Sequence, residues 1–129
     1  MKDIQSREDL SVLVRTFYGK IRQNEFIGSF FNETIDDWEE HLEKLTDFWE
    51  SNLFFKAKFR GNPQQAHIGV DRRFHHQISM EHFGEWLNLW TATIDELFKG
   101  ELAERAKNNA RKMATHLYLT LYQARPKTL

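Results

Sequence analysis

The chain has 129 residues and a nearly balanced charge, with 18 lysines and arginines against 19 aspartates and glutamates. This length favours a single domain over residues 1–129, large enough to bury a hydrophobic core. A net charge of −1 provides no basic field for nucleic acid. The chain has no cysteine, which excludes disulfides, thiolate metal sites and a cysteine nucleophile, so histidine or carboxylate must hold any metal.

The amino terminus, MKDIQSREDLSVLVRTF, lacks the uninterrupted apolar segment of a signal peptide. No run approaches the roughly 18 apolar residues of a membrane span. We therefore expect a cytoplasmic protein that does not bind a membrane. Aromatic residues make up 14% of the chain, which suits either a small core built from large side chains or the lining of a large, flat cofactor.

In the first half of the chain, apolar residues recur at helical spacing. The first stripe, over residues 10–21, follows Ser6, a good capping residue. A short apolar segment, FIGSFF, comes next at 26–31. We expect the following helix to start near Asp36 or Asp37 and to run to about Lys56.

In the second half, the sequence Gly61–Asn62–Pro63 is a strong break, and Pro63 is well placed to start a short helix. The polar segment IGVDRRFHHQI at 68–78 has no clear period, and we expect a loop there. Ser79 can cap a further helix that ends before Gly100. A last helix carries the apolar stripe over residues 102–121. No segment has the pattern of a strand, so the predicted fold class is all-α.

Six histidines are spread along the chain, at positions 41, 67, 75, 76, 82 and 116. They form no HExxH motif, and no glutamate stands three residues before any of them, as a di-iron bundle would require. Glycine-rich phosphate loops and a nucleophile elbow are absent too. These patterns argue against a zinc protease, a carboxylate-bridged metal bundle and a serine hydrolase. We assign no role to His82 or His116.

His41 and His67 are the candidates for a functional site. His41 lies on the apolar stripe of its helix, and His67 follows the chain break, four residues after Pro63. The ordinary interpretation of either is a core histidine with a satisfied hydrogen bond. One imidazole on each side of a gap lined by aromatic residues also suits an iron porphyrin, where one histidine binds the metal and the other side stays open.

Tyr18 and Trp86 each lie on the apolar stripe of a helix, and each carries one polar group that needs a partner when it is buried. If these groups converge with His41, they form a polar pocket in an apolar wall. The commoner alternative is that each of them bonds a nearby backbone carbonyl.

Five motifs occur in order along nearly the whole chain: FYGKI at 17–21, IGSFFN at 27–32, WEEHLEKLTDFW at 38–49, RGNPQQAHIGV at 60–70 and HFGEWLNLW at 82–90. With these motifs the chain resembles the truncated, two-on-two haemoglobins, and among them the third group, which is found in bacteria. The resemblance implies a globin-like, two-over-two helical sandwich that holds one b-type haem. The paired-glycine motifs of other truncated-globin groups are absent here, as they are in the third group.

The resemblance also implies roles for individual residues. His67 would bind the haem iron as the proximal ligand. Tyr18 and Trp86 would donate hydrogen bonds to bound dioxygen, and His41 would stand beside that ligand. The remaining expected haem contacts are Phe31 packed on the porphyrin, Phe17 and Leu45 in the apolar wall, and Arg72 or Arg73 paired with a propionate.

The spacing between His67 and Trp86 leaves an alternative candidate for the proximal ligand. These residues are nineteen positions apart, more than the family leads us to expect, so DRRFHHQIS at 71–79 resembles an insertion. His76 is nearer to Trp86 and is the alternative ligand. The match of GNPQQAH to the family's Gly-x-Pro lead-in favours His67.

The implied function is the binding of dioxygen, and of other small diatomic ligands, at a polar distal pocket. One alternative is haem-dependent turnover of nitric oxide or peroxide with an external reductase, since the chain has no flavin or nicotinamide site of its own. Another is a cofactor-free helical interaction module, in which the aromatic residues are simply core. The sequence leaves the oligomeric state open.

Overall fold

The computed structural model describes residues 1–57 and 59–126. Within them it contains helices and no strand, which confirms the predicted all-α class. None of the helices in this part of the chain is long and apolar enough to cross a membrane. The helices are α1 (Arg7–Gln23), α2 (Gly28–Asn32), α3 (Trp38–Phe54), α4 (Pro63–Arg73), α5 (Met80–Leu97) and α6 (Glu101–Ala124).

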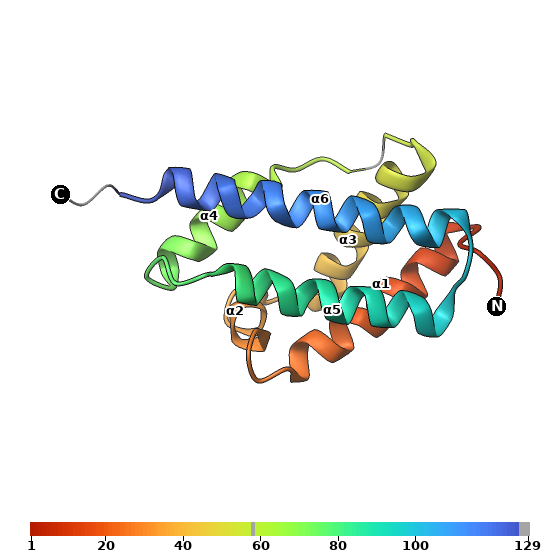
Figure 1. Ribbon diagram of the computed structural model, residues 1–129, viewed down its shortest axis with the longest axis horizontal. Helices are drawn as coiled ribbons and strands as arrows, with labels where there is room; N and C mark the ends of the chain where they lie inside the picture. The colour runs from red at the N-terminus through yellow and green to blue at the C-terminus, as the bar shows by residue number, and fades with distance from the viewer. Residues whose placement is uncertain (58, 127–129) are drawn as a thin grey trace.

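Two pairs of helices form the body of the molecule (Figure 1). Helices α5 and α6 run antiparallel and side by side, and α1 packs against α3. The pairs are joined by contacts of α1 with α5 and of α3 with α6. The short α4 packs on α6, towards the carboxyl end of the chain. This is the two-over-two arrangement that the family resemblance implies.

Polar side chains mark the starts of three helices, because they satisfy backbone N–H groups that have no partner in the first turn. Ser6, Asp37 and Asn62 each accept a hydrogen bond from the N–H three residues on, at 3.2, 3.1 and 3.1 Å. Pro63, at the first position of α4, has no N–H to satisfy. The caps predicted at Ser6 and Asp37 are confirmed.

The predicted loop at 68–78 is wrong in its first half. Helix α4 continues to Arg73, and a turn follows in which His75 and His76 have left-handed φ angles of 62° and 59°. The helical period is hidden in the sequence because a charged residue, Asp71, takes a buried position and is 2% exposed. The end of α3 also differs slightly, since the helix stops at Phe54 rather than at Lys56.

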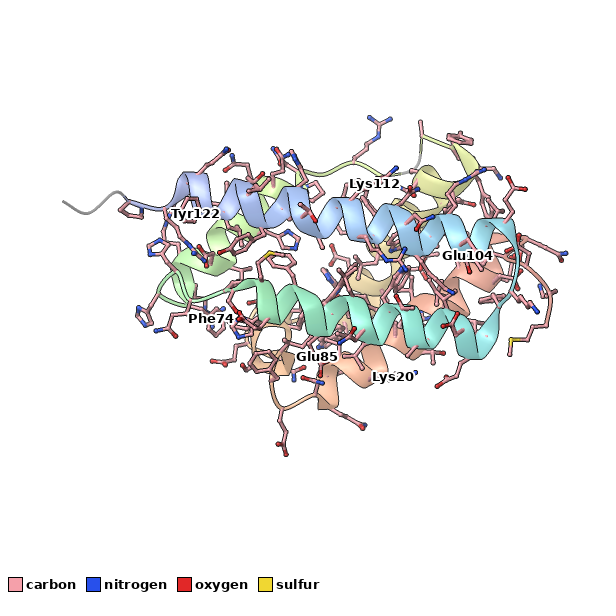
Figure 2. All side chains as sticks on the ribbon, viewed as in Figure 1. Lys20, Phe74, Glu85, Glu104, Lys112 and Tyr122 are labelled. Atoms are coloured by element: carbon pink, nitrogen blue, oxygen red, sulfur yellow. The ribbon has the colours of Figure 1, made fainter. Side chains whose placement is uncertain are left out.

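Asp71 occupies this interior position because it is fully hydrogen-bonded. Its carboxylate accepts two hydrogen bonds from the Arg125 guanidinium, both at 3.0 Å, and one from the Ile78 backbone N–H at 3.2 Å. A buried charge is tolerated when it is paired in this way. At the same corner Phe74, labelled in Figure 2, packs edge-on against Phe30 of α2 with ring centroids 4.8 Å apart.

At the other end of the molecule, the amino-terminal segment is fixed to the start of α6. Asp3 accepts hydrogen bonds from the backbone N–H groups of Leu102 and Ala103, at 2.8 and 2.9 Å. Gly100, the residue before α6, has φ 151°, and a Cβ there would lie 2.5 Å from Asp3. Glycine therefore allows an acidic side chain from a distant part of the chain to cap α6.

Candidate functional site

A cavity of about 430 Å³ lies among the helices and is lined by side chains from all of those described above. A volume of this size falls in the usual range for small-molecule and cofactor sites. The wall is largely aromatic and aliphatic, and several of its side chains are only half-buried, so they have apolar surface left to cover. The apolar lining includes Ile27, Phe30, Phe31, Leu45, Phe48, Phe59, Met113 and Leu117.

His67 lines this cavity from α4. Its Nδ1 lies 2.6 Å from the Pro63 carbonyl oxygen, one helical turn earlier. A carbonyl can only accept, so Nδ1 carries the proton and donates it, and in the neutral ring Nε2 keeps a free lone pair. Burial lowers the pKa of His67, and the hydrogen bond to Pro63 opposes this only in part. The imidazole is therefore neutral near pH 7 and oriented for ligation.

Tyr18 of α1 and Trp86 of α5 also line the cavity, and their polar groups meet. Hydrogen bonding by the Trp86 indole N–H acts to lower the pKa of the Tyr18 phenol. Burial raises the pKa of Tyr18 to about 12, and this hydrogen bond offsets only part of the rise. The phenol therefore stays protonated, and its own proton is available for another acceptor.

His41 lines the cavity from α3, beside Tyr18. The two rings are perpendicular, with their centroids 6.2 Å apart. Burial lowers the pKa of His41, and the positive charge of Lys44 lowers it further. The cavity thus holds a neutral imidazole next to a protonated phenol.

A metal ion could not be held in this cavity by protein side chains alone, at least in the described residues. These contain no group of three or more histidines, cysteines, aspartates or glutamates placed to hold a metal ion. A single buried imidazole with a free nitrogen suits a metal whose other ligands come from a cofactor ring. The apolar, aromatic wall suits the faces of such a ring.

No protein-family model matches the sequence. A curated group 3 truncated haemoglobin from Campylobacter jejuni is 25% identical to the chain over 122 residues, which cover 92% of both proteins. The crystal structure of a group III truncated haemoglobin from the same organism aligns with 98% of this chain and 100% of its own, with a TM-score of 0.84 and 26% identity. The chain has the truncated-globin fold. Its resemblance to the third group of truncated haemoglobins is confirmed, which suggests a haem-binding globin.

The structure brings together most of the residues predicted for the site. Tyr18, His41, His67 and Trp86 all line the cavity, as do Phe31 and Leu45. This is a convergence of side chains from five helices, α1 to α5, that are far apart in the sequence.

Phe17 lies behind the cavity wall rather than in it. It is 0% exposed and packs edge-on against Tyr18 and Trp86, with ring centroids 4.8 and 5.5 Å away. Phe17 therefore supports Tyr18 and Trp86 from the core side. Helical geometry explains the difference, since adjacent residues of a helix point in different directions.

Arg72 and Arg73 are exposed at the end of α4 and are not among the described residues that line the cavity. They follow His67 by five and six positions, which places them on the other side of the helix. The propionate contact expected of Arg72 or Arg73 stays a prediction that this placement does not support. His76 lies in the turn after α4 and does not reach the described lining either.

The sequence analysis did not single out two basic residues that do line the cavity, Lys44 and Arg60. Lys44 could have been found, because it follows His41 by three residues and so lies on the same side of α3. Arg60 carried no such signal, since it lies in an irregular segment between α3 and α4.

Proposed function

We propose that this chain is a haem protein that binds dioxygen and other small diatomic ligands, with one b-type haem held by His67. The observation that carries the proposal is the His67 imidazole, which donates Nδ1–H to the Pro63 carbonyl at 2.6 Å and so keeps Nε2 unprotonated inside an apolar cavity. Such a second hydrogen bond fixes the tautomer of a metal-binding histidine. The domain spans residues 1–129, and a cytoplasmic location remains our prediction.

The cavity wall supports this assignment. Phe31 and Leu45 offer apolar contacts to the faces of the ring, and Phe17 backs the wall from the core. Among the described residues, Lys44 and Arg60 are the lysine and arginine that line the cavity, so we place the two propionate carboxylates with them.

When bound, the haem iron supplies the centre that holds a diatomic gas. The chain contributes hydrogen bonds and a dry environment. Tyr18 donates its O–H to the gas, and the indole N–H of Trp86, which the phenol oxygen accepts, makes that phenol a stronger donor through cooperativity. His41 completes the polar side of the site. Because the surrounding wall is apolar, these dipoles act in a low dielectric, where they stabilise a polarised ligand most strongly.

A visible spectrum of the purified protein tests the proposal, because a bound haem produces an intense Soret band. We expect this band in the wild type and in His76→Ala, and its loss or a marked shift in His67→Ala. Loss in His76→Ala instead would transfer the ligand role to His76. A protein that shows no Soret band, even after addition of hemin, would be a cofactor-free helical module.

A second candidate function is turnover of nitric oxide or peroxide with an external reductase as the electron donor. The observation in its favour is the neutral His41 imidazole beside the protonated Tyr18, a base and an acid at one cavity. Consumption of nitric oxide or peroxide by the haem-loaded protein plus a reductant, compared with free haem, tests this function. A rate no higher than that of free haem would leave ligand binding alone.

A further inference from the structure

The four tryptophans of the chain form one continuous aromatic array with Tyr18. Trp49 stacks on Trp90 with ring centroids 4.6 Å apart, and Trp90 stacks on Trp86 at 6.0 Å. The Phe17 ring packs edge-on against both Trp86 and Tyr18, with centroids 5.5 and 4.8 Å away, and the Tyr18 ring lies 6.1 Å from the Trp38 ring. We call Tyr18 and the four tryptophans the aromatic relay.

The aromatic relay connects the cavity to the surface. Trp49, Trp86 and Tyr18 line the cavity, and Trp90 is 0% exposed behind them. Trp38 does not line the cavity and is only half-buried. The relay therefore has a buried end at Trp49 and an end at Trp38 that solvent can reach.

Oxidisable side chains are few elsewhere in this molecule. The chain has no cysteine, so tryptophan and tyrosine are the side chains that lose a single electron most readily. Aromatic rings in contact or joined by a hydrogen bond exchange electrons quickly. An oxidant generated in the cavity would meet Tyr18, Trp49 and Trp86 in its wall, and an electron lost from them would be replaced along the relay.

We propose that the aromatic relay carries electrons from Trp38 at the surface to hydrogen peroxide undergoing reduction in the cavity, and so removes oxidising equivalents from the haem site. This inference rests on the proposed function, because the haem is the group that reacts with peroxide. The partner at the outer end is a small one-electron donor in solution, of the ascorbate type.

The electrons and protons balance as follows. Reduction of one hydrogen peroxide to two waters consumes two electrons and two protons. For each electron, Tyr18 gives its phenolic proton to a peroxide oxygen in the cavity and its electron to the oxidant. Trp38 then reduces the tyrosyl radical, which recovers a proton from water. Trp38 loses its indole proton to solvent and becomes a neutral radical, which the donor reduces while water returns the proton.

Arg22 determines whether the Trp38 radical is cationic or neutral. Its guanidinium carbon lies 4.5 Å from the centroid of the Trp38 ring. A positive charge there disfavours a radical cation on the indole, so the electron leaves Trp38 together with the N–H proton. Arg22→Gln should make Trp38 easier to oxidise.

The first test maps oxidation by peptide mass spectrometry after the haem-loaded protein has reacted with hydrogen peroxide without a reductant. We expect oxygen addition at Trp38 to exceed modification of Tyr122, which is 65% exposed near the carboxyl end of α6 (Figure 2) and lies outside the relay. Tyr18→Phe should lower Trp38 oxidation several-fold per peroxide consumed, Arg22→Gln should raise it, and Tyr122→Phe should leave it unchanged. Equal Trp38 oxidation in Tyr18→Phe would overturn the proposal.

The second test requires neither peroxide nor a reaction of the haem. Azide radicals generated by pulse radiolysis oxidise tryptophans of the full chain, and transient absorption follows the tryptophan and tyrosyl radicals. We expect first-order growth of the tyrosyl signal, at a rate independent of protein concentration, that is lost in Tyr18→Phe and kept in Tyr122→Phe. Growth that persists in Tyr18→Phe would overturn the relay, whereas a missing Soret band would overturn the proposed function alone.

Discussion

The helices that carry Tyr18 and His67 are held in the molecule in different ways. Helix α1 buries six residues in the core: Leu10, Leu13, Val14, Phe17, Tyr18 and Ile21. Helix α4, of which every residue is described, buries Asp71 alone. The polar side of the site is thus an extension of the core, whereas the proposed metal ligand lies on a helix that the core hardly holds. Cofactor binding should therefore order α4 far more than α1.

The largest expected effect on stability comes from a substitution in the core behind Tyr18. Trp90 is 0% exposed, stacks on Trp49 and donates its indole N–H to the Ala106 carbonyl at 3.2 Å. Trp90→Ala should lower the free energy of unfolding by about 3–5 kcal/mol in urea denaturation, through lost burial and a residual cavity. Val70→Ala, at a half-buried position of α4, should cost much less in the haem-free protein. Equal costs would show that α4 is as much a part of the core as α5.

The next largest effect concerns the Asp71–Arg125 ion pair, which links α4 to the segment after α6. Asp71→Ala leaves the Arg125 guanidinium and the Ile78 N–H without their partner, which should cost about 3 kcal/mol. Hydrogen exchange should accelerate in α4 and the turn after it, and change little in α5. Glu96→Gln is the matched control, since it breaks the exposed Lys20–Glu96 pair, worth at most about 1 kcal/mol. A uniform acceleration of hydrogen exchange over all helices would show that the ion pair stabilises the whole fold rather than α4 locally.

The same contrast explains what the sequence could reveal. Helices with apolar stripes, and the site residues on those stripes such as Tyr18, His41 and Trp86, follow from periodicity and capping. Helix α4 was missed in part because Asp71 is buried through a partner, Arg125, 54 residues away. No local pattern encodes such a partner.

The sequence also could not show which residues line the cavity and which lie behind its lining. Phe17 and Tyr18 are neighbours on one buried stripe, and only the packing of α5 shows that Phe17 lies in the second layer. Arg60 reaches the cavity from an irregular segment, where periodicity carries no information. Identifying the residues that line the cavity therefore required the tertiary structure.

A smaller effect tests the end of α6 that is remote from α4. Asp3→Ala removes the acceptor for the Leu102 and Ala103 N–H groups and should cost about 1 kcal/mol. Burial raises the pKa of Asp3, but backbone hydrogen bonds and Arg105 outweigh it, so the pKa lies below 3.8. The contribution is therefore complete above pH 3.8 and is lost as the pH falls through the lowered native pKa. A wild-type–variant difference that stays constant into acid would contradict this.

The smallest effect concerns the start of α5, next to the turn that follows α4. His82 Nδ1 accepts the Ser79 backbone N–H at 2.9 Å, as a capping box requires, and only the neutral ring can do so. Burial lowers the pKa of His82 below 6.5, although Glu81 opposes this, so the unfolded chain takes up the proton first as the pH falls. This stabilisation is present above pH 6.5 and declines as the pH falls through the native pKa.

His82→Gln isolates the pH-dependent contribution of His82 to stability, because glutamine can accept the same Ser79 N–H without titrating. At pH 7 the two proteins should differ by less than about 0.5 kcal/mol, and the variant should lose less stability in acid. His41 and His67 titrate in both proteins, so the difference between the two pH profiles reports His82 alone. Identical profiles would mean that the acid sensitivity of this protein comes from other titrating groups, such as His41 and His67, rather than from His82 at the start of α5.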